Sequence, residues 1–237
     1  MNRIQQEIKH FTDLEYIWSG QKTPAGLKRY DNKASLFKKM CKPTKKDIIL
    51  EIGSGDGVFT KRLKGTNAKI IATDITPAVV SRSRERIKYN GLTYKLENCE
   101  KLSFKNNTFT VVCGISILHH VNMKKTLQEC YRVLDKGGRI FFTEPNLLNP
   151  IIYVTTNISW LRGIMEYSPG ERALIRKNVE KELIKIGFSK IVVKNYDFLL
   201  PWAPKFMIGF LEKAGFILEK LPLIKEISGS LLIYAEK

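Results

Sequence analysis

Residues 48–57 read IILEIGSGDG, an apolar run interrupted only by Glu51 and followed at once by three glycines at alternate positions. A short apolar run that ends in a glycine-rich turn is typical of a strand buried in a parallel sheet. Glycine permits the tight turn and lets a ligand approach the backbone closely. The stretch therefore predicts a first strand and a ligand-binding loop of an α/β fold.

A second acidic residue, Asp74, ends the next apolar run, residues 69–74. In open α/β sheets, ligands bind in the crevice at the carboxyl ends of the strands. A carboxylate at that place can accept hydrogen bonds from both hydroxyls of a ribose. We therefore expect Asp74, with Ile75 beside it, to contact a nucleoside.

Apolar runs and helical patterns alternate from Asp47 onward, which is the signature of repeated βα units. Strands are predicted over residues 48–52, 69–74, 94–96, 109–115, 139–144, 190–194 and 230–235. Helices are predicted over residues 58–64 and 171–186, from Pro77 to before Gly91, and from Met123 to before Gly137. Thr76 and Asn122 are suited to cap two of these helices, and the last two strands are a candidate antiparallel pair.

The composition favours one globular domain, because 237 residues with 43% hydrophobic content suffice for a single α/β core. The formal net charge of +17 is spread along the chain, with one dense run. That run consists of Lys38, Lys39, Lys42, Lys45 and Lys46. It is interpreted either as a solvated surface or as a contact for an anionic partner such as a phosphate-bearing substrate, a membrane or RNA.

The four cysteines, Cys41, Cys99, Cys113 and Cys130, lie far apart, without a CxxC pair or a companion histidine. We expect no metal site, no disulfide framework and a reduced, cytoplasmic protein, with Cys113 and Cys130 in the core. The first residues lack the apolar region of a secretory signal, and no run of about 18 apolar residues follows. Neither a leader nor a membrane-spanning helix is therefore expected.

Further motifs follow the glycine loop in the order of one known family. The loop fits E-x-G-x-G-x-G and not the dinucleotide pattern G-x-G-x-x-G, which would need glycine in place of Val58. Residues 97–104, ENCEKLSF, resemble the G-D-A-E-x-L-P-F segment, with Asn98 for the usual Asp. Residues 109–121 resemble the segment ending in l-h-H-v, with Thr110 for the usual Asp, and YRVLDKGG at 131–138 resembles R-V-L-K-P-G-G. Residues 48–145 thus resemble the class I S-adenosylmethionine-dependent methyltransferases of the small-molecule and quinone type.

The resemblance implies a doubly wound, mostly parallel seven-stranded sheet of the Rossmann-like methyltransferase type. The implied strand order is 3-2-1-4-5-7-6, with a helical insertion before the last strand. S-adenosylmethionine is the implied cofactor, with Glu51 holding its methionyl tail through water and Asn98 accepting from the adenine amino group. The implied cofactor-binding residues are Glu51, Gly53, Ser54, Gly55, Gly57, Asp74, Ile75, Asn98, Cys99, Glu100, Gly114 and Ile115.

Methyl transfer from a sulfonium chiefly needs alignment and a dry pocket. A general base helps only if the nucleophile keeps its proton at neutral pH, as an alcohol or a phenol does. The candidate bases are His120, His119 and Glu144, which lie at the ends of the fourth and fifth predicted strands. The alternatives are a packing or capping role for these residues and an enzyme without a protein base.

Three segments outside the cofactor-binding core (47–145) are expected on the substrate side. The N-terminal helical arm, residues 1–46, is expected to act as a lid or to dock on the sheet, and residues 146–170 to form a wall of the pocket. Aromatic residues and one arginine mark the arm: Phe11, Tyr16, Trp18, Arg29 and Tyr30. Residues 198–229 combine a narrow charged stripe with a wide apolar surface, which can pack on the domain, form a dimer contact or contact lipid. Gly209, Gly215 and Pro222 are expected to break any helix there.

The sequence therefore predicts a single-domain methyltransferase that acts on a small or lipid-like acceptor, at oxygen rather than at nitrogen or carbon. An anionic membrane surface is a candidate partner, because basic charge surrounds the apolar insertion. One alternative is an RNA methyltransferase, which the charge alone supports. The other is a non-catalytic partner subunit that keeps the fold, against which the intact glycine loop and Asp74 speak.

Overall fold

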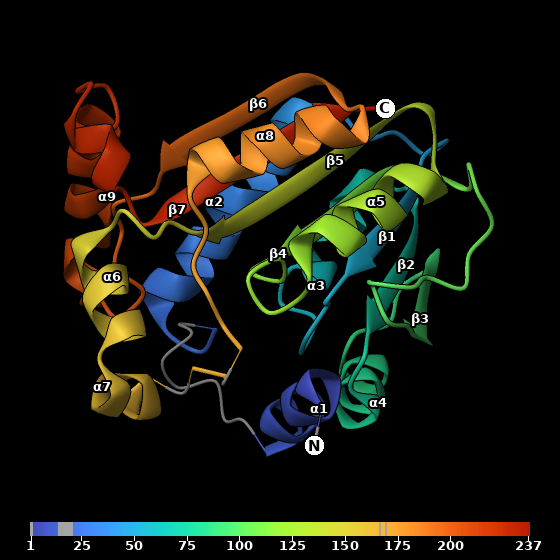
Figure 1. The fold of residues 1–237 in the computed structure, drawn as a ribbon, viewed down its shortest axis with the longest axis horizontal. Helices are drawn as coiled ribbons and strands as arrows, with labels where there is room; N and C mark the ends of the chain where they lie inside the picture. The colour runs from blue at the N-terminus through green and yellow to red at the C-terminus, as the bar shows by residue number, and fades with distance from the viewer. Residues whose placement is uncertain (1, 14–20, 166, 169) are drawn as a thin grey trace.

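The structure is a computed structural model that describes residues 2–13, 21–165, 167–168 and 170–237. Its seven strands form one sheet in the order β3-β2-β1-β4-β5-β7-β6, which confirms the predicted order (Figure 1). β1 to β5 pair in parallel, and β7 is antiparallel to both β5 and β6. The strands are β1 (Ile48–Ile52), β2 (Lys69–Asp74), β3 (Leu92–Leu96), β4 (Phe109–Ile115), β5 (Leu134–Pro145), β6 (Ser189–Tyr196) and β7 (Ser230–Glu236).

Helices cover both faces of the sheet (Figure 1). They are α1 (Arg3–Asp13), α2 (Pro24–Cys41), α3 (Thr60–Leu63), α4 (Pro77–Arg86), α5 (Met123–Val133), α6 (Pro150–Asn157), α7 (Ser159–Ile164), α8 (Arg176–Ile186) and α9 (Ile208–Leu218). Short 3₁₀ turns are η1 (Lys64–Thr66), η2 (Lys205–Met207) and η3 (Ile224–Ile227). None of the helices in the described ranges combines the length and the apolar character needed to cross a membrane.

Two hydrophobic cores hold the layers together. On one face, α5 and α8 pack Leu127 and Leu183 against the sheet, and Cys130 lies in the same cluster. On the other face, α2 places the Phe37 ring edge-on to Phe141 of β5, with the ring centroids 5.3 Å apart. Since both faces are covered, the central strands are apolar on both sides, which is why β1 and β4 read as continuous apolar runs.

Several predicted helix ends are wrong for local reasons. The helix expected to reach Gly91 ends at Arg86, because Ile87 is extended and its side chain packs over the glycine loop at Gly57. The helix expected from residue 171 begins at Arg176, because Leu174 instead pairs with the end of β5. The first short helix is α3 alone, followed by η1.

The prediction that Gly137 and Gly138 end a helix is wrong, because both lie within β5. The Gly137 amide donates to the carbonyl of Lys237, and the Lys237 amide donates to the carbonyl of Gly138, which fixes both glycines in the sheet. Gly209 and Gly215 do not break a helix either, since both lie inside α9. A side chain at 215 would meet the Cβ atom of Phe198 at 3.3 Å, so glycine there lets α9 approach that segment closely.

The packing of α2 on the sheet yields a stability prediction. Phe37→Ala removes a ring that is 0% exposed, so we expect the free energy of unfolding to fall by about 3–5 kcal/mol in urea denaturation. The matched control is Phe206→Ala, at a ring that is 86% exposed, for which a change of about 0.5 kcal/mol or less is expected. Equal effects of the two substitutions would contradict the assigned core.

Candidate active site

A cavity of about 600 Å³ lies at the carboxyl ends of β1, β2 and β4. Most of the residues predicted for the site line it. These are Glu51, Gly53, Ser54, Gly55, Asp74, Ile75, Asn98, Cys99, Glu100, Ile115, His119 and His120. Gly57, Gly114 and Glu144 are not among its lining residues.

The glycine loop has the backbone conformation that its sequence predicts. Gly53 and Gly55 have φ angles of +64° and +52°, a left-handed region that side chains rarely adopt. No atom lies within 4 Å of the position that a Cβ atom would take at Gly55, so the loop leaves open space toward the cavity. The Ser54 amide donates to the carbonyl of Thr73 over 2.9 Å, which ties the loop to the end of β2.

Asp74 holds this arrangement in place. One carboxylate oxygen accepts the Gly55 amide at 3.0 Å, and the other accepts the Thr76 amide at 2.9 Å. Burial raises the pKa of Asp74, and the two amide hydrogen bonds oppose that shift. Each oxygen can accept another hydrogen bond from the cavity side, as the two hydroxyls of a ribose require.

Glu51 lies at the floor of the cavity and is 2% exposed. One of its carboxylate oxygens, Oε2, has no hydrogen-bond partner in the protein. Burial, and then the charge of Asp74, raise the pKa of Glu51 to about 8, while the neighbouring Thr60 hydroxyl opposes the shift. Without a cation beside it the Glu51 carboxyl therefore keeps its proton at pH 7, and the ammonium group of a methionyl tail would favour its ionised form.

His119 is held between the carboxylates of Glu144 and Glu171. Its Nδ1 lies 2.6 Å from Glu144, and its Nε2 lies 3.4 Å from Glu171. Burial disfavours the charged ring, but hydrogen bonds to Glu144 and Glu171 outweigh burial and raise the pKa of His119 to about 10. The two carboxylates therefore favour the doubly protonated imidazole, which has no free nitrogen to accept a proton. Whether His119 acts in the reaction stays a prediction.

Glu144 stabilises the conformation of the loop after β4. It is 1% exposed, and its second oxygen accepts the amides of Ile117 and Leu118 at 3.0 and 2.9 Å. With His119 on the other oxygen, the carboxylate is fully engaged within the protein. Glu144 thus positions His119 and has no route to an acceptor in the cavity.

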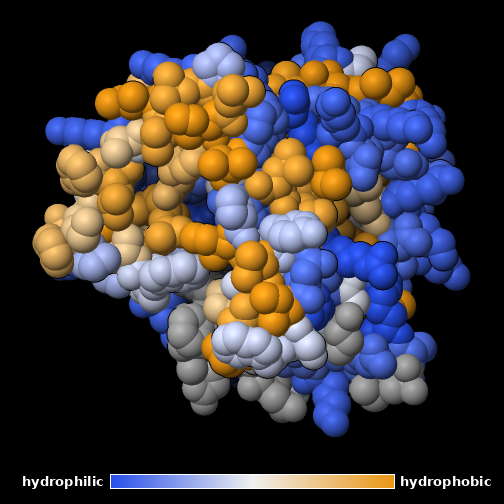
Figure 2. Space-filling view, turned by 60° about the vertical axis from the view of Figure 1, so that its left-hand side comes forward, coloured by the Kyte–Doolittle hydropathy of each residue, from blue (hydrophilic) through white to orange (hydrophobic). Residues whose placement is uncertain are grey.

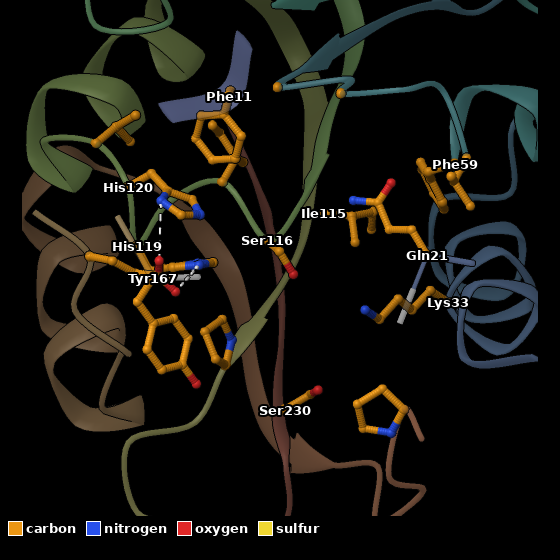
Figure 3. Close-up of a pocket in the computed structure, with 18 of the residues that line it drawn as sticks. Phe11, Gln21, Lys33, Phe59, Ile115, Ser116, His119, His120, Tyr167 and Ser230 are labelled. Carbon is orange, nitrogen blue, oxygen red and sulfur yellow. Dashed lines mark ion pairs between the residues drawn. The ribbon is translucent and has the colours of Figure 1, made fainter. Parts of the chain in front are cut away.

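His120 faces the N-terminal arm. Its Nδ1 lies 3.1 Å from the Ser168 hydroxyl and 3.5 Å from a Glu7 carboxylate oxygen. The Phe11 ring packs edge-on against it, with the centroids 5.1 Å apart, so α1 closes this side of the cavity (Figure 3). Tyr16 and Trp18, the other aromatic residues expected in this part of the arm, lie outside the described residues.

One group in the described part of the chain, formed by His119, His120 and Glu171, brings metal-ligand atoms within 4.8 Å of one another. A histidine ligand must present a deprotonated nitrogen. The carboxylates on both sides of His119 favour its doubly protonated ring instead. These contacts suit a hydrogen-bonded cluster better than metal ligation.

Lys33 is a cavity residue that the sequence analysis missed. It is 6% exposed, lies on α2 and projects into the cavity opposite His119 and His120 (Figure 3). Burial, and then the neighbouring Arg29 charge, lower the pKa of Lys33 to about 7, although Asp197 opposes the shift. A helical spacing in the arm could have pointed to it. Gly26, Arg29, Tyr30 and Lys33 all line the cavity from one face of α2.

Arg29 ties the arm to the two residues that flank the C-terminal insertion. Its Nε donates to Asp197 at 2.7 Å, and one terminal nitrogen donates to the Ser230 hydroxyl at 3.2 Å. α2 therefore docks on the sheet through Phe37 and also forms one wall of the cavity. The lid role expected for the arm stays a prediction.

Comparison with known proteins agrees with this geometry. Residues 50–142 match the family described as "Methyltransferase domain". The "Ubiquinone/menaquinone biosynthesis C-methyltransferase UbiE" of Zymomonas mobilis is 34% identical over 114 residues, 46% of this chain and 46% of that protein. The "Ubiquinone biosynthesis O-methyltransferase" of Nitrosococcus oceani is 29% identical over 159 residues, 62% of this chain and 64% of that protein. The chain thus spans about half to two thirds of the length of these relatives.

Among solved structures, an S-adenosylmethionine-dependent methyltransferase of Thermotoga maritima superposes with a TM-score of 0.69 and covers 100% of both chains. Its sequence identity is 17%, so the likeness concerns the fold. The predicted fold class is confirmed by this likeness together with the strand order.

The Asp74 geometry yields a binding prediction. Asp74→Ala should weaken S-adenosylhomocysteine binding by at least about a hundredfold, because it removes two hydrogen bonds to a charged group, which contribute roughly 1.5–3 kcal/mol each. Asp74→Asn, which keeps one acceptor oxygen, should lose less. The control is Asp56→Asn in the same loop, whose carboxylate pairs with Arg82 at 3.2 Å and does not line the cavity. Calorimetric affinities that Asp74→Ala leaves unchanged would refute the site.

Proposed function

The chain carries a class I S-adenosylmethionine-dependent methyltransferase domain at residues 50–142, and on that premise we propose that it methylates a quinone-type or other lipid-like acceptor at a hydroxyl oxygen. The observation that supports the proposal is one continuous cavity with a polar end and an apolar end. Polar groups for the cofactor lie at the strand ends, and apolar side chains of Ile152 and Leu199 lie on the other side.

The cofactor end is formed by residues whose chemistry suits S-adenosylmethionine. Asp74 would accept the ribose hydroxyls, Glu51 would neutralise the ammonium group, and residues 97–100 would border the adenine. When bound, the cofactor supplies a methyl group that is already activated on a sulfonium. The protein then has to align the acceptor, exclude water and accept a proton.

Lys33 and His120 are the candidate proton acceptors. An amine with a pKa of about 7 is substantially neutral at physiological pH and can take the proton of a phenolic hydroxyl. His119, held as a cation, instead places positive charge near the acceptor and favours its phenolate form. A phenolate can be methylated at oxygen or on its ring. The two relatives, a C- and an O-methyltransferase by name, act at different atoms.

The alternatives from the sequence find less support. The lysine run at residues 38–46 precedes β1, so it lies at the amino ends of the strands, away from the cavity. These lysines therefore give no reason to place RNA at the cavity. A non-catalytic subunit would have no use for an open cavity with an unpartnered carboxylate at Glu51. A peripheral encounter with an anionic membrane forms part of the proposal, since a lipid-like acceptor resides there.

The reaction is tested with carbon-13 methyl-labelled S-adenosylmethionine and a prenylated hydroquinone dispersed in detergent. We expect label in the organic phase, with the chemical shift of an aryl ether, and far less with Asp74→Ala at a cofactor concentration near the wild-type Kd. A ring-methyl shift would reassign the acceptor atom to carbon. Transfer of label to total RNA and not to the hydroquinone would overturn the proposal.

Lys33 makes the rate depend on pH. Because a base must be deprotonated to act, kcat/KM should rise with pH and level off above about 7. Lys33→Met should lose that rise and at least about tenfold in rate, whereas Lys38→Met, at an exposed position of the same helix, should keep both. A wild-type profile in Lys33→Met would remove Lys33 as the base.

The stability of Lys33→Met shows whether a loss of rate comes from misfolding. The pKa of Lys33 is lowered from 10.5 to about 7, so between these values the unfolded chain binds the extra proton, and stability falls as the pH is lowered. Lys33→Met removes this cost. Its unfolding midpoint at pH 7 should therefore be no lower than that of the wild type.

A further inference from the structure

We propose that α6, α7 and residues 199–227 form a surface that docks on an anionic phospholipid membrane and opens the cavity directly to the lipid. The inference rests on the proposed function for the nature of the acceptor. Its physical basis is separate, and lies in exposed apolar side chains, in the orientation of charged groups and in the position of the cavity mouth.

Large apolar side chains gather on one side of the molecule, at α6, α7 and α9 (Figures 1 and 2). Phe206 and Leu223 are 86% and 85% exposed. The other members of this apolar face are Ile151, Tyr153, Val154, Ile158, Trp160, Ile164, Leu200, Trp202, Phe210, Phe216, Ile217, Leu221, Ile224 and Ile227. An apolar patch over several elements marks an interaction site, so packing on the domain does not account for the insertion.

The charges around the apolar face are sorted by sign. Acidic groups of the insertion point toward the domain. Glu212 accepts from Asn32 at 2.7 Å, and Glu219 accepts the amide of Asp197 at 2.8 Å. The exposed charges beside the face are basic, at Lys205, Lys213 and Lys220, for none of which the described residues provide an ion pair. Outward lysines beside apolar side chains complement an anionic lipid surface.

α6 and α7 carry almost no charge that lipid would have to accommodate. Arg162 is their one charged residue, and its guanidinium points inward, donating to the carbonyls of Thr156 and Ser168 at 2.8 and 2.7 Å. The outer sides of both helices therefore present apolar and aromatic groups, including Trp160, which is 66% exposed. Tryptophan at such a face is typical of proteins that lie in the membrane interface.

The cavity opens within this apolar face. Four side chains both line the cavity and count among the exposed apolar residues: Ile151, Leu200, Trp202 and Ile227. They come from both sides of the proposed surface, α6 on one and the insertion on the other. A lipid-borne acceptor could thus enter head first while its apolar tail stays in the membrane.

A second copy of the chain fits the surface less well. A two-fold interface places the same patch on both sides, so it would bring together two surfaces that both carry the positive charge of Lys205, Lys213 and Lys220. Like charges at an interface are unfavourable. An anionic membrane has the opposite charge and needs no second apolar face.

The test is sedimentation with vesicles of phosphatidylcholine containing a minority of phosphatidylglycerol, without cofactor or acceptor. The wild type should bind. Phe206→Ser/Phe210→Ser/Leu223→Ser should lose at least about tenfold in partitioning, because exposed apolar side chains supply the insertion energy. The matched control is Ile184→Ser, an exposed apolar residue of α8 outside the face, which should bind like the wild type.

The contribution of the exposed lysines to membrane binding is tested with a triple substitution. Lys205→Gln/Lys213→Gln/Lys220→Gln should lose roughly fivefold per lysine on phosphatidylglycerol vesicles and little on pure phosphatidylcholine. Lys38→Gln/Lys39→Gln/Lys42→Gln, at the opposite end of the strands, should lose less. Equal losses for the two sets would overturn the assigned orientation.

Docking and methyl transfer are separated by assaying all variants with the detergent-dispersed hydroquinone and with S-adenosylhomocysteine. Retained cofactor binding and detergent activity in a variant that no longer binds vesicles would support the docking surface. If the wild-type protein is active in detergent but does not bind vesicles, the docking surface is refuted. A wild-type dimer that the apolar substitutions dissociate would also refute it. Vesicle binding without any methyl transfer would support the surface and refute the proposed function.

Discussion

The hydrogen bonds of Asp74 to the amides of Gly55 and Thr76 are the constraint on which the site depends. They join the glycine loop of β1 to the end of β2, so that two segments far apart in the sequence face one cavity. The parallel sheet makes this possible, since the carboxyl ends of β1 and β2 meet at the same edge. Everything else in the site is arranged around that edge.

Burial gives the cavity its chemistry. Glu51, His119 and Lys33 are all removed from water, yet each responds differently because its neighbours differ. The pKa of Glu51 rises next to Asp74, that of His119 rises between two carboxylates, and that of Lys33 falls beside Arg29. One cavity thereby holds a carboxyl group that can pair with a cation (Glu51), a positively charged imidazole (His119) and a candidate base (Lys33).

The core could be predicted from the sequence because its signals are local. Strand runs, glycine positions and the Asn122 cap each depend on neighbouring residues, and the structure has the predicted cap. The strand order is not a local property; it came from the family resemblance and is confirmed. Helix ends such as Arg86 and the intact α9 depend on tertiary packing, at Ile87 and Phe198. Lys33 reads as an ordinary surface lysine until α2 docks on the sheet. Likewise, the sequence does not show whether the apolar side chains of the insertion are buried or exposed, because this depends on how the insertion packs on the domain.

The most direct measurement is a crystal structure of the chain with bound S-adenosylhomocysteine. We expect ribose hydroxyls on both Asp74 oxygens, the amino group within reach of Glu51, and the sulfur facing the space between Lys33 and His120. A nucleoside bound elsewhere, or one that leaves Asp74 without a ligand contact, would refute the assigned cofactor site.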